Sequence, residues 1–253
     1  MLCYFQSVMA DLIALSASST LMPPIIQIKH LFKAYPQAEA EYPVLQDINL
    51  EINRGEFVAI VGPSGNGKST LLNLLTGIDY PSQGEIWVNG AALHRFNHEQ
   101  LSQWRCLNLG IVFQFFQLLP ALSLLQNVIL PMDFAAQLSR SERKHRAMAL
   151  LDRVGLADQA QRLPSQVSGG QQQRAAIARA LANDPPLIVA DEPTGNLDTE
   201  TADAVFDLFS HLRDQGKTLV MVTHNEALAD AASRKLEIRN GRLFADSQTL
   251  VGA

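Results

Sequence analysis

The spacing of hydrophobic positions changes along the chain and predicts a β-rich beginning, a helical middle and an alternating end. Residues 25–61 contain three stretches rich in β-branched residues, separated by Pro, Asn and Gly, which predict strands. Two Asn-Gly pairs, at 89–90 and 240–241, each lie between short apolar stretches and predict tight hairpins. The beginning of the chain is therefore expected to form an antiparallel β-layer.

From about residue 98 to 165 the pattern becomes helical. Ser139 and Glu142 have the spacing of a capping box at a helix start. The helix after it is expected to end at Gly155. Its apolar face carries Ala147, Leu150, Leu151 and Val154. A second helix is expected at roughly 200–215, closed by Gly216.

Two short, continuous apolar runs flank this second helix, at 187–190 and 218–223. Such runs are typical of parallel strands that are buried on both faces. The order of elements therefore predicts an α/β sheet core, with an N-terminal antiparallel β-subdomain and an inserted helical subdomain at about 98–165.

Composition narrows the classes of function. The chain has 253 residues, of which 47% are hydrophobic and 18% charged, as expected of a folded globular protein. Its formal charge is −5, and no run of Lys and Arg occurs, which argues against nucleic acid as a partner. Cys3 and Cys106 are far apart, which excludes a disulfide framework or a structural zinc site.

The two ends of the chain are expected to lie outside the folded domain. Residues 1–24 are interpreted as a disordered leader or an over-long start, with Met22 as an alternative start. A secretory signal needs basic residues before its apolar stretch, and the first basic residue here is Lys29. Residues 246–253 are interpreted as a C-terminal tail.

One segment is long enough to span a bilayer, because no charged residue occurs between Arg105 and Asp133. However, several amide side chains and Pro120 lie within it, and these would be costly in hydrocarbon. We therefore expect 106–132 to be a soluble segment with an unusually apolar surface. The alternative is that its phenylalanines belong to the core, at least in part: Phe113, Phe115 and Phe116.

The strongest local signal fits the pattern G-x-x-x-x-G-K-[ST], between a predicted strand and a predicted helix. Its glycines let the backbone N–H groups converge on phosphate oxygens, and the helix N-terminus adds its positive end. Lys68 is expected to bind the β- and γ-phosphates, and the Ser69 hydroxyl to bind Mg²⁺. The predicted ATP-binding residues here are Gly62, Pro63, Ser64, Gly65, Asn66, Gly67, Lys68, Ser69 and Thr70. The leucines that follow, at 71, 72, 74 and 75, are assigned to core packing.

Two acids follow the predicted strand 187–190, at the strand end where open α/β sheets bind ligands. Asp191 is assigned to Mg²⁺, which needs a single carboxylate and often binds it through water. Glu192 is assigned as the general base that accepts a proton from the attacking water. The alternative is that this pair only caps a turn after the strand.

Ser168-Gly169-Gly170-Gln171 predicts a second glycine-rich helix start, with Ser168 as N-cap, and so a second anion site. Together with the first glycine-rich motif, residues 62–70 (the P-loop), this second motif makes the chain resemble the ATP-binding-cassette (ABC) ATPases. The resemblance covers essentially residues 25–245. The resemblance implies a P-loop NTPase (RecA-like) core, and implies that these four residues form the signature motif that binds the ATP of a twin subunit. Val167, where the family usually has leucine, is the one visible departure.

The resemblance implies roles for four further residues. Gln114 matches the glutamine that contacts Mg²⁺ and links the two subdomains, and Asp198 matches the D-loop aspartate. His224 matches the switch histidine that faces the γ-phosphate, which adds it to the catalytic set of Glu192, Lys68 and Gln114. Tyr35 matches the aromatic residue that stacks on adenine, although an exposed loop tyrosine is the alternative.

Within the family, the extended loop after Tyr35 and the motifs FQFFQLLP and ADEPTGNLD resemble the lipoprotein-release and macrolide-export group. This implies an ATP-sandwich homodimer with ATP and Mg²⁺ as cofactors. It also implies export or release through a separate FtsX/MacB-like integral-membrane permease, with the chain peripheral on the cytoplasmic face of the inner or plasma membrane. Segment 106–132 is where we expect the permease to dock, because exposed apolar patches mark partners.

Three other functions fit the sequence less well. A soluble non-transport ABC ATPase of translation or DNA repair would carry two cassettes, long coiled coils or zinc cysteines, and the sequence has none of these. A P-loop GTPase would carry an N-K-x-D motif, which the sequence also lacks. A cassette without hydrolytic activity would have lost catalytic residues, whereas Lys68, Asp191, Glu192 and His224 are all present.

Overall fold

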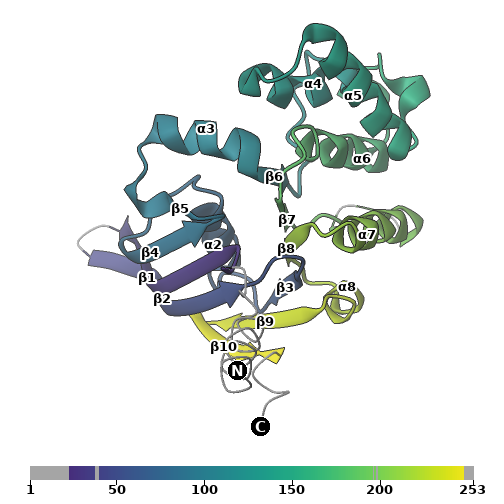
Figure 1. The fold of residues 1–253 in the computed structure, drawn as a ribbon. Helices are drawn as coiled ribbons and strands as arrows, with labels where there is room; N and C mark the ends of the chain where they lie inside the picture. Colours follow the sequence, from purple (N-terminus) through teal and green to yellow (C-terminus); the bar gives the residue numbers. More distant parts are fainter. Residues whose placement is uncertain (1–22, 38–39, 196, 198, 248–253) are drawn as a thin grey trace, which may run out of the picture.

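The computed structural model describes residues 23–37, 40–195, 197 and 199–247, which form two sheets and a lobe of helices (Figure 1). The predicted leader falls almost wholly outside these residues, and so does most of the predicted tail. Among the described residues, no helix combines the length and the hydrophobicity that crossing a bilayer requires.

A six-stranded sheet forms the centre of the molecule, in the order β10-β9-β3-β8-β7-β6. Its strands pair in parallel except for the hairpin of β9 and β10. The two predicted buried strands and the second predicted hairpin are confirmed. The strands are β3 (Phe57–Val61), β6 (Leu109–Val112), β7 (Leu187–Asp191), β8 (Thr218–Val222), β9 (Arg234–Arg239) and β10 (Arg242–Asp246).

A four-stranded antiparallel sheet, in the order β2-β1-β4-β5, confirms the predicted N-terminal β-layer. Asn89 and Gly90 both have positive φ, as the tight turn between β4 and β5 requires. The strands are β1 (Ile26–Gln37), β2 (Ala40–Ile52), β4 (Gln83–Val88) and β5 (Ala91–Ala92).

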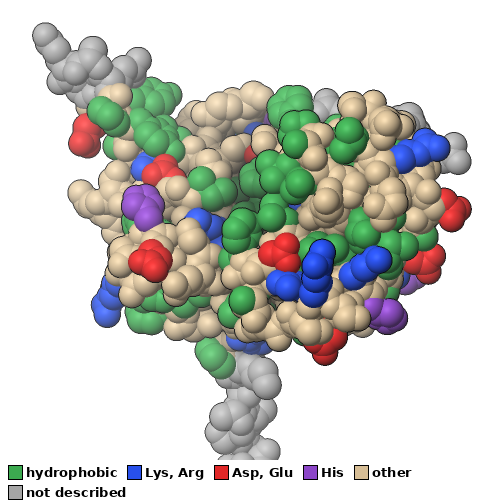
Figure 2. All heavy atoms as spheres, turned by 90° about the horizontal axis from the view of Figure 1, so that it is seen from above, with side chains coloured by type: hydrophobic (Ala, Val, Ile, Leu, Met, Phe, Trp, Pro, Cys, Tyr) green, Lys and Arg blue, Asp and Glu red, His purple; other side chains and the backbone are tan. Residues whose placement is uncertain are grey.

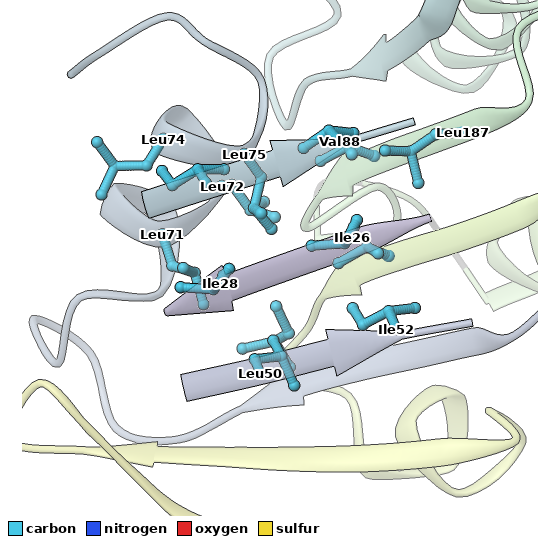
Figure 3. Packing of buried hydrophobic residues seen from close by; sticks show 14 of the residues in the cluster. Ile26, Ile28, Leu50, Ile52, Leu71, Leu72, Leu74, Leu75, Val88 and Leu187 are labelled. Carbon is cyan, nitrogen blue, oxygen red and sulfur yellow. The ribbon is translucent and has the colours of Figure 1, made fainter. Parts of the chain in front are cut away.

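The helix after the P-loop, α2 (Lys68–Leu75), packs into one core cluster with strands of both sheets. Figure 3 shows its four leucines in this cluster, together with residues of β1, β2, β4 and β7. The predicted packing role of these leucines is therefore confirmed. Because α2 is fixed between two sheets, its N-terminus has a defined position at the edge of the core.

The helices α4, α5 and α6 form a lobe beyond β6 and β7 (Figure 1). They share a second core cluster with α7 and with strands of the central sheet. Ser139 and Glu142 form the predicted capping box of α5, and the apolar face of that helix is buried. Three short 3-10 segments cover 93–95, 157–159 and 164–166. The helices are α3 (His98–Asn108), α4 (Leu124–Ala135), α5 (Arg140–Arg153), α6 (Gly169–Ala180), α7 (Thr199–Asp214) and α8 (Glu226–Asp230).

The stretch with a helical pattern, about 98–165, is interrupted by β6, which was not predicted and joins the central sheet beside β7. This segment is short, apolar and partly β-branched, so periodicity alone could not separate it from the flanking helices. Gly110 also allows a close approach, because a Cβ there would lie 2.5 Å from the carbonyl oxygen of Ala180.

Asn127 accounts for one of the amide side chains in the segment 106–132, which we call the charge-free segment. Its side chain is fully buried in α4 and accepts a hydrogen bond from the backbone N of Leu119 at 2.8 Å. Its amide group donates to the carbonyl oxygens of Leu119, Leu122 and Ser123 at 3.2, 3.0 and 3.0 Å. One amide therefore closes the loop that precedes the helix.

We predict that Asn127→Leu, which keeps the branched shape of the side chain but removes all four bonds, lowers the free energy of unfolding by about 2–3 kcal/mol. Urea denaturation measures this change. The control Gln103→Leu, on an exposed position of α3, should change it by less than about 0.5 kcal/mol. Equal effects of the two substitutions would contradict the role given to Asn127.

Candidate functional site

The predicted catalytic residues meet at one edge of the central sheet. β3 and β7 both pair in parallel with β8, with Ile60 and Asp191 opposite Val222. Their carboxyl ends are therefore level, and the three segments that follow these strands converge. At such an edge, α/β sheets bind ligands.

The P-loop has the backbone that its glycines predict. Gly62 has a φ of 140°, and a Cβ there would lie 2.1 Å from the carbonyl oxygen of Ile238. Gly67, at the N-cap of α2, also has positive φ, and no side chain caps the helix. The first N–H groups of α2 are therefore available to an anion in the loop.

Asn66 holds this loop in place, a role that the sequence pattern does not reveal. Its amide group donates to the carbonyl oxygens of Pro63 and Ser64 at 3.2 and 3.0 Å. Its Oδ1 accepts a hydrogen bond from the backbone N of Asn240, in the β9–β10 hairpin, at 2.6 Å. The C-terminal hairpin thus supports the P-loop directly.

Lys68 is almost fully buried and folds back over the loop. Its Nζ donates to the carbonyl oxygens of Gly62 and Pro63 at 2.8 and 2.9 Å. Burial lowers the pKa of its ammonium group, whereas the charges of Glu192 and Asp191 act to raise it. The ammonium group of Lys68 is therefore held next to the uncapped N-terminus of α2.

The two acids after β7 face different partners. Asp191 Oδ1 lies 3.5 Å from the Ser69 hydroxyl, and burial raises the pKa of Asp191 despite this bond and the nearby charges of Lys68 and His224. Glu192 Oε1 lies 2.8 Å from His224 Nε2. The structure therefore pairs Asp191 with the P-loop helix and Glu192 with His224, two residues after β8.

Gln114 approaches the same place from the loop after β6. A Cβ on Gly195 would lie 3.4 Å from Glu192 Oε2 and 3.5 Å from Gln114 Nε2. The structure thus brings together the predicted residues Lys68, Ser69, Gln114, Asp191, Glu192 and His224. Asn196 and Asp198, in the predicted D-loop, lie outside the described residues.

Among the described residues, no group of three or more His, Cys, Asp or Glu could hold a metal ion. A metal bound here would have one carboxylate from Asp191 and one hydroxyl from Ser69. This donor set fits Mg²⁺, which keeps several waters and shares phosphate oxygens.

Tyr35 lies in β1, not in a loop, and is 37% exposed. Its hydroxyl donates to Asp79 Oδ2 at 2.7 Å, and Lys33 donates to Asp79 Oδ1 at 2.7 Å while lying 4.6 Å from the Tyr35 ring centroid. Burial raises the pKa of Tyr35, as do the hydrogen bond and charge of Asp79. No sequence pattern indicates Asp79, whereas Lys33 could have been predicted because it lies two positions before Tyr35 in the same strand.

The signature motif belongs to the helical lobe, apart from α2 (Figure 1). Ser168 is the N-cap of α6, as predicted. Its hydroxyl accepts from the backbone N of Gln171 at 3.2 Å, and Gln171 Oε1 accepts from the backbone N of Ser168 at 2.9 Å. One chain therefore presents two glycine-rich helix starts in two different parts of the fold.

The charge-free segment contributes many of the residues that line an apolar groove of about 950 Å³ between α3, α4 and the end of α6. Figure 2, the view from above, shows hydrophobic side chains gathered near the centre of this face. Phe134, in the groove, is 71% exposed. Phe115 is 68% exposed, and Phe113 and Phe116 are half-buried and outside both core clusters. The alternative that at least one of these three is core is wrong, because they lie on the surface loop after β6.

Arg179 joins this groove to the signature motif. It lines the groove and donates hydrogen bonds to the carbonyl oxygens of Phe116, at 2.8 Å, and of Gln117. Both acceptor residues have positive φ, a costly conformation that neighbouring contacts must hold. The Phe116 ring in turn lies 3.6 Å from the position of a Cβ on Gly169.

We predict that Gly62→Ala abolishes ATP binding, because the added methyl group collides with the β9 backbone and displaces the loop. Gly65→Ala is the matched control, since its Cβ would meet nothing within 4 Å. It should weaken binding only by the strain of a positive φ, about 1–2 kcal/mol. Fluorescent ATP-analogue titration measures both, and equal affinities for the two variants would contradict the geometry.

Comparison with known proteins agrees with these features. The chain matches the family described as "ABC transporter" over residues 45–195. It is 46% identical over 206 residues to the lipoprotein-releasing system ATP-binding protein LolD 1 of Chlorobium chlorochromatii, covering 81% of this chain and 84% of that protein. It is also 46% identical over 226 residues to the macrolide export ATP-binding/permease protein MacB of Sodalis glossinidius, covering 89% of this chain but 34% of that longer protein.

A solved structure shares the fold. The dimeric structure of a post-hydrolysis state of the ATP-binding cassette MJ0796, bound to ADP and Pi, matches with a TM-score of 0.83 and 40% identity. The match covers 87% of this chain and 97% of that one. The chain therefore belongs to the ABC transporter family, as an ATP-binding subunit with ATPase activity.

Proposed function

We propose that two copies of this chain form an ATP-sandwich homodimer that drives a separate integral-membrane permease. The observation that carries the proposal is the separation of the P-loop from the signature motif within one chain. Each motif ends in a helix N-terminus suited to phosphate, yet the two lie in different parts of the fold. A pocket that uses both needs a second copy, and the MJ0796 cassette has been seen as a dimer.

In this proposal, residues 62–70 and Tyr35 of one copy hold the ATP, with Tyr35 stacked on adenine. The signature motif of the other copy faces the same γ-phosphate through Ser168, Gly169, Gly170 and Gln171. Asp198 belongs to the interface between the two copies. We place the ATPase domain at 25–245 and its helical subdomain at about 98–165, with α6 packed against it in the helical lobe.

Hydrolysis would proceed by transfer of a proton from the attacking water to the carboxylate of Glu192. The water oxygen bonds to the γ-phosphorus, and ADP leaves with the electrons of the broken P–O bond. His224 holds Glu192 in place through its 2.8 Å contact and faces the γ-phosphate, which Lys68 neutralises. Ser69, Asp191 and Gln114 would hold Mg²⁺, which adds positive charge to the phosphates when bound. Most of the catalysis is thus positioning and charge neutralisation.

The apolar groove is the proposed docking site for the permease, which we expect to be FtsX/MacB-like. Support comes from its size, from the exposed Phe134 and from the relatives that are named for lipoprotein release and macrolide export. Docking there would place the chain on the cytoplasmic face of the inner or plasma membrane. Arg179 would carry the effect of docking to the loop after Gln114.

We predict that Glu192→Gln binds ATP, loses at least about a hundredfold in turnover and accumulates as a dimer that ATP holds together. The amide keeps the shape of the carboxylate but cannot accept the proton. Phosphate release and analytical ultracentrifugation measure the two effects. Glu99→Gln, on the exposed start of α3, is the control, and turnover by Glu192→Gln at its rate would refute the base assignment.

We predict that Phe134→Asp weakens binding to the co-expressed permease of the same organism by about tenfold or more, because docking would bury an unpaired carboxylate. Affinity purification in detergent, with quantified permease recovery, measures the loss. Phe244→Asp is the matched control, because Phe244 is also exposed (63%) but lies on β10, away from the groove. Equal losses, or none, would contradict docking at the groove.

A further inference from the structure

A buried amide connects the signature helix to the segment that carries the proposed base. Gln173 lies in α6, about one and a half turns after Ser168, and is fully buried. Its Nε2 donates a hydrogen bond to the carbonyl oxygen of Pro193 at 2.6 Å. Its Oε1 is also buried and has no hydrogen-bond partner in the described part of the chain.

Stability alone does not explain this residue. A buried acceptor without a partner is unfavourable, and an apolar side chain of similar volume would avoid that cost. What the amide provides is one short, directed bond to the residue directly after Glu192. The function of Gln173 is therefore to be sought in what that bond holds.

Glu192 is a residue whose backbone needs to be held. Its φ is 45°, in the left-handed region that is unfavourable for a residue with a Cβ. On one side, its N–H donates to the carbonyl oxygen of Val222 in β8 at 2.9 Å. On the other side, Gln173 donates to the carbonyl oxygen of the following residue, Pro193. The helix α6 and the strand β8 therefore hold Glu192 between them. Such strained residues persist only where their surroundings over-determine them.

The helix α6 links this bond to the signature motif. Ser168 and Gln173 lie about 7.5 Å apart along one continuous helix, so they move together. In the dimer, a nucleotide of the partner subunit would engage the N-terminus of α6. Any shift of the helix on that engagement reaches the Pro193 carbonyl group, and through it the backbone of Glu192.

We propose that Gln173 is a positioning residue that couples the two ATP sites of the dimer. Through its bond to Pro193, it aligns Glu192 in the chain's own pocket when the signature motif of the same chain engages the ATP held by the partner. This inference rests on the proposed ATP-sandwich dimer and on Glu192 as the base. The bond connects the pocket that a chain completes with its signature motif to the pocket in which the Glu192 of that chain acts.

The first test is Gln173→Met, which keeps the volume and removes the donor. We expect kcat to fall about tenfold, while KM for ATP and thermal stability stay within the range of the control Gln172→Met, on the neighbouring, half-buried position. Gln173→Leu, which is shorter and branched, serves the same purpose if the long methionine side chain does not fit the site. An unchanged kcat in the folded variants would overturn the proposal.

Mixed dimers, purified through two different tags, provide the sharper test. In the first, one subunit carries both Gln173→Met and Glu192→Gln, so all turnover uses the Glu192 and Gln173 of the intact subunit. In the second, the substitutions lie on opposite subunits, so the only remaining base belongs to the chain that lacks Gln173.

We expect the first mixed dimer to match a dimer with Glu192→Gln alone in one subunit, and the second to turn over ATP about tenfold more slowly. The reverse order would mean that Gln173 supports only the signature motif, and equal rates would mean that it does nothing specific; either result overturns the proposal. The homodimer of Glu192→Gln separates a failure of this coupling role from a failure of the base assignment. Turnover by that homodimer would refute Glu192 as the base, whatever the mixed dimers show.

Discussion

The parallel pairing of β3, β8 and β7 is the constraint on which the rest of the structure depends. Because the three strands end level, the P-loop, the Asp191-Glu192 pair and His224 come to one edge. The packing of α2 between the two sheets then fixes the helix N-terminus at that edge. A shift of register in any of these strands would separate the Lys68 charge from the carboxylates.

The second feature is that the chain holds its two phosphate-binding helix ends apart and connects them by a few polar contacts. Arg179 connects the groove to the strained turn after Gln114, and that turn packs against the signature motif. Gln173 connects the signature helix to the segment after Glu192. Each contact crosses from one part of the fold to another, so a movement of the helical lobe has a physical path to the catalytic edge.

Much of this could be predicted from the sequence. Strands with continuous apolar runs, Asn-Gly hairpins and capping boxes are local signals, and the P-loop and Ser168 carry their own helix starts. β6 was missed because four apolar residues between helices have no periodicity of their own. The contacts of Asp79, Arg179 and Gln173, and that of Asn66 with Asn240, could not be predicted because the partners lie far away in the sequence. Only the folded chain brings them within hydrogen-bond distance. The apolar surface expected of 106–132 is present, because Phe115 is exposed on the loop after β6, and Phe113 and Phe116 are half-buried there, outside both core clusters.

The central claim is that each ATP pocket is completed by a second copy of the chain, and complementation of two inactive variants tests it most directly. Lys68→Ala removes the P-loop charge and Ser168→Arg blocks the signature motif. In their mixed dimer, one pocket combines an intact P-loop with an intact signature motif. The account predicts that each variant alone is inactive and that mixing them restores part of the wild-type ATP turnover. Wild-type turnover by Ser168→Arg on its own would contradict it.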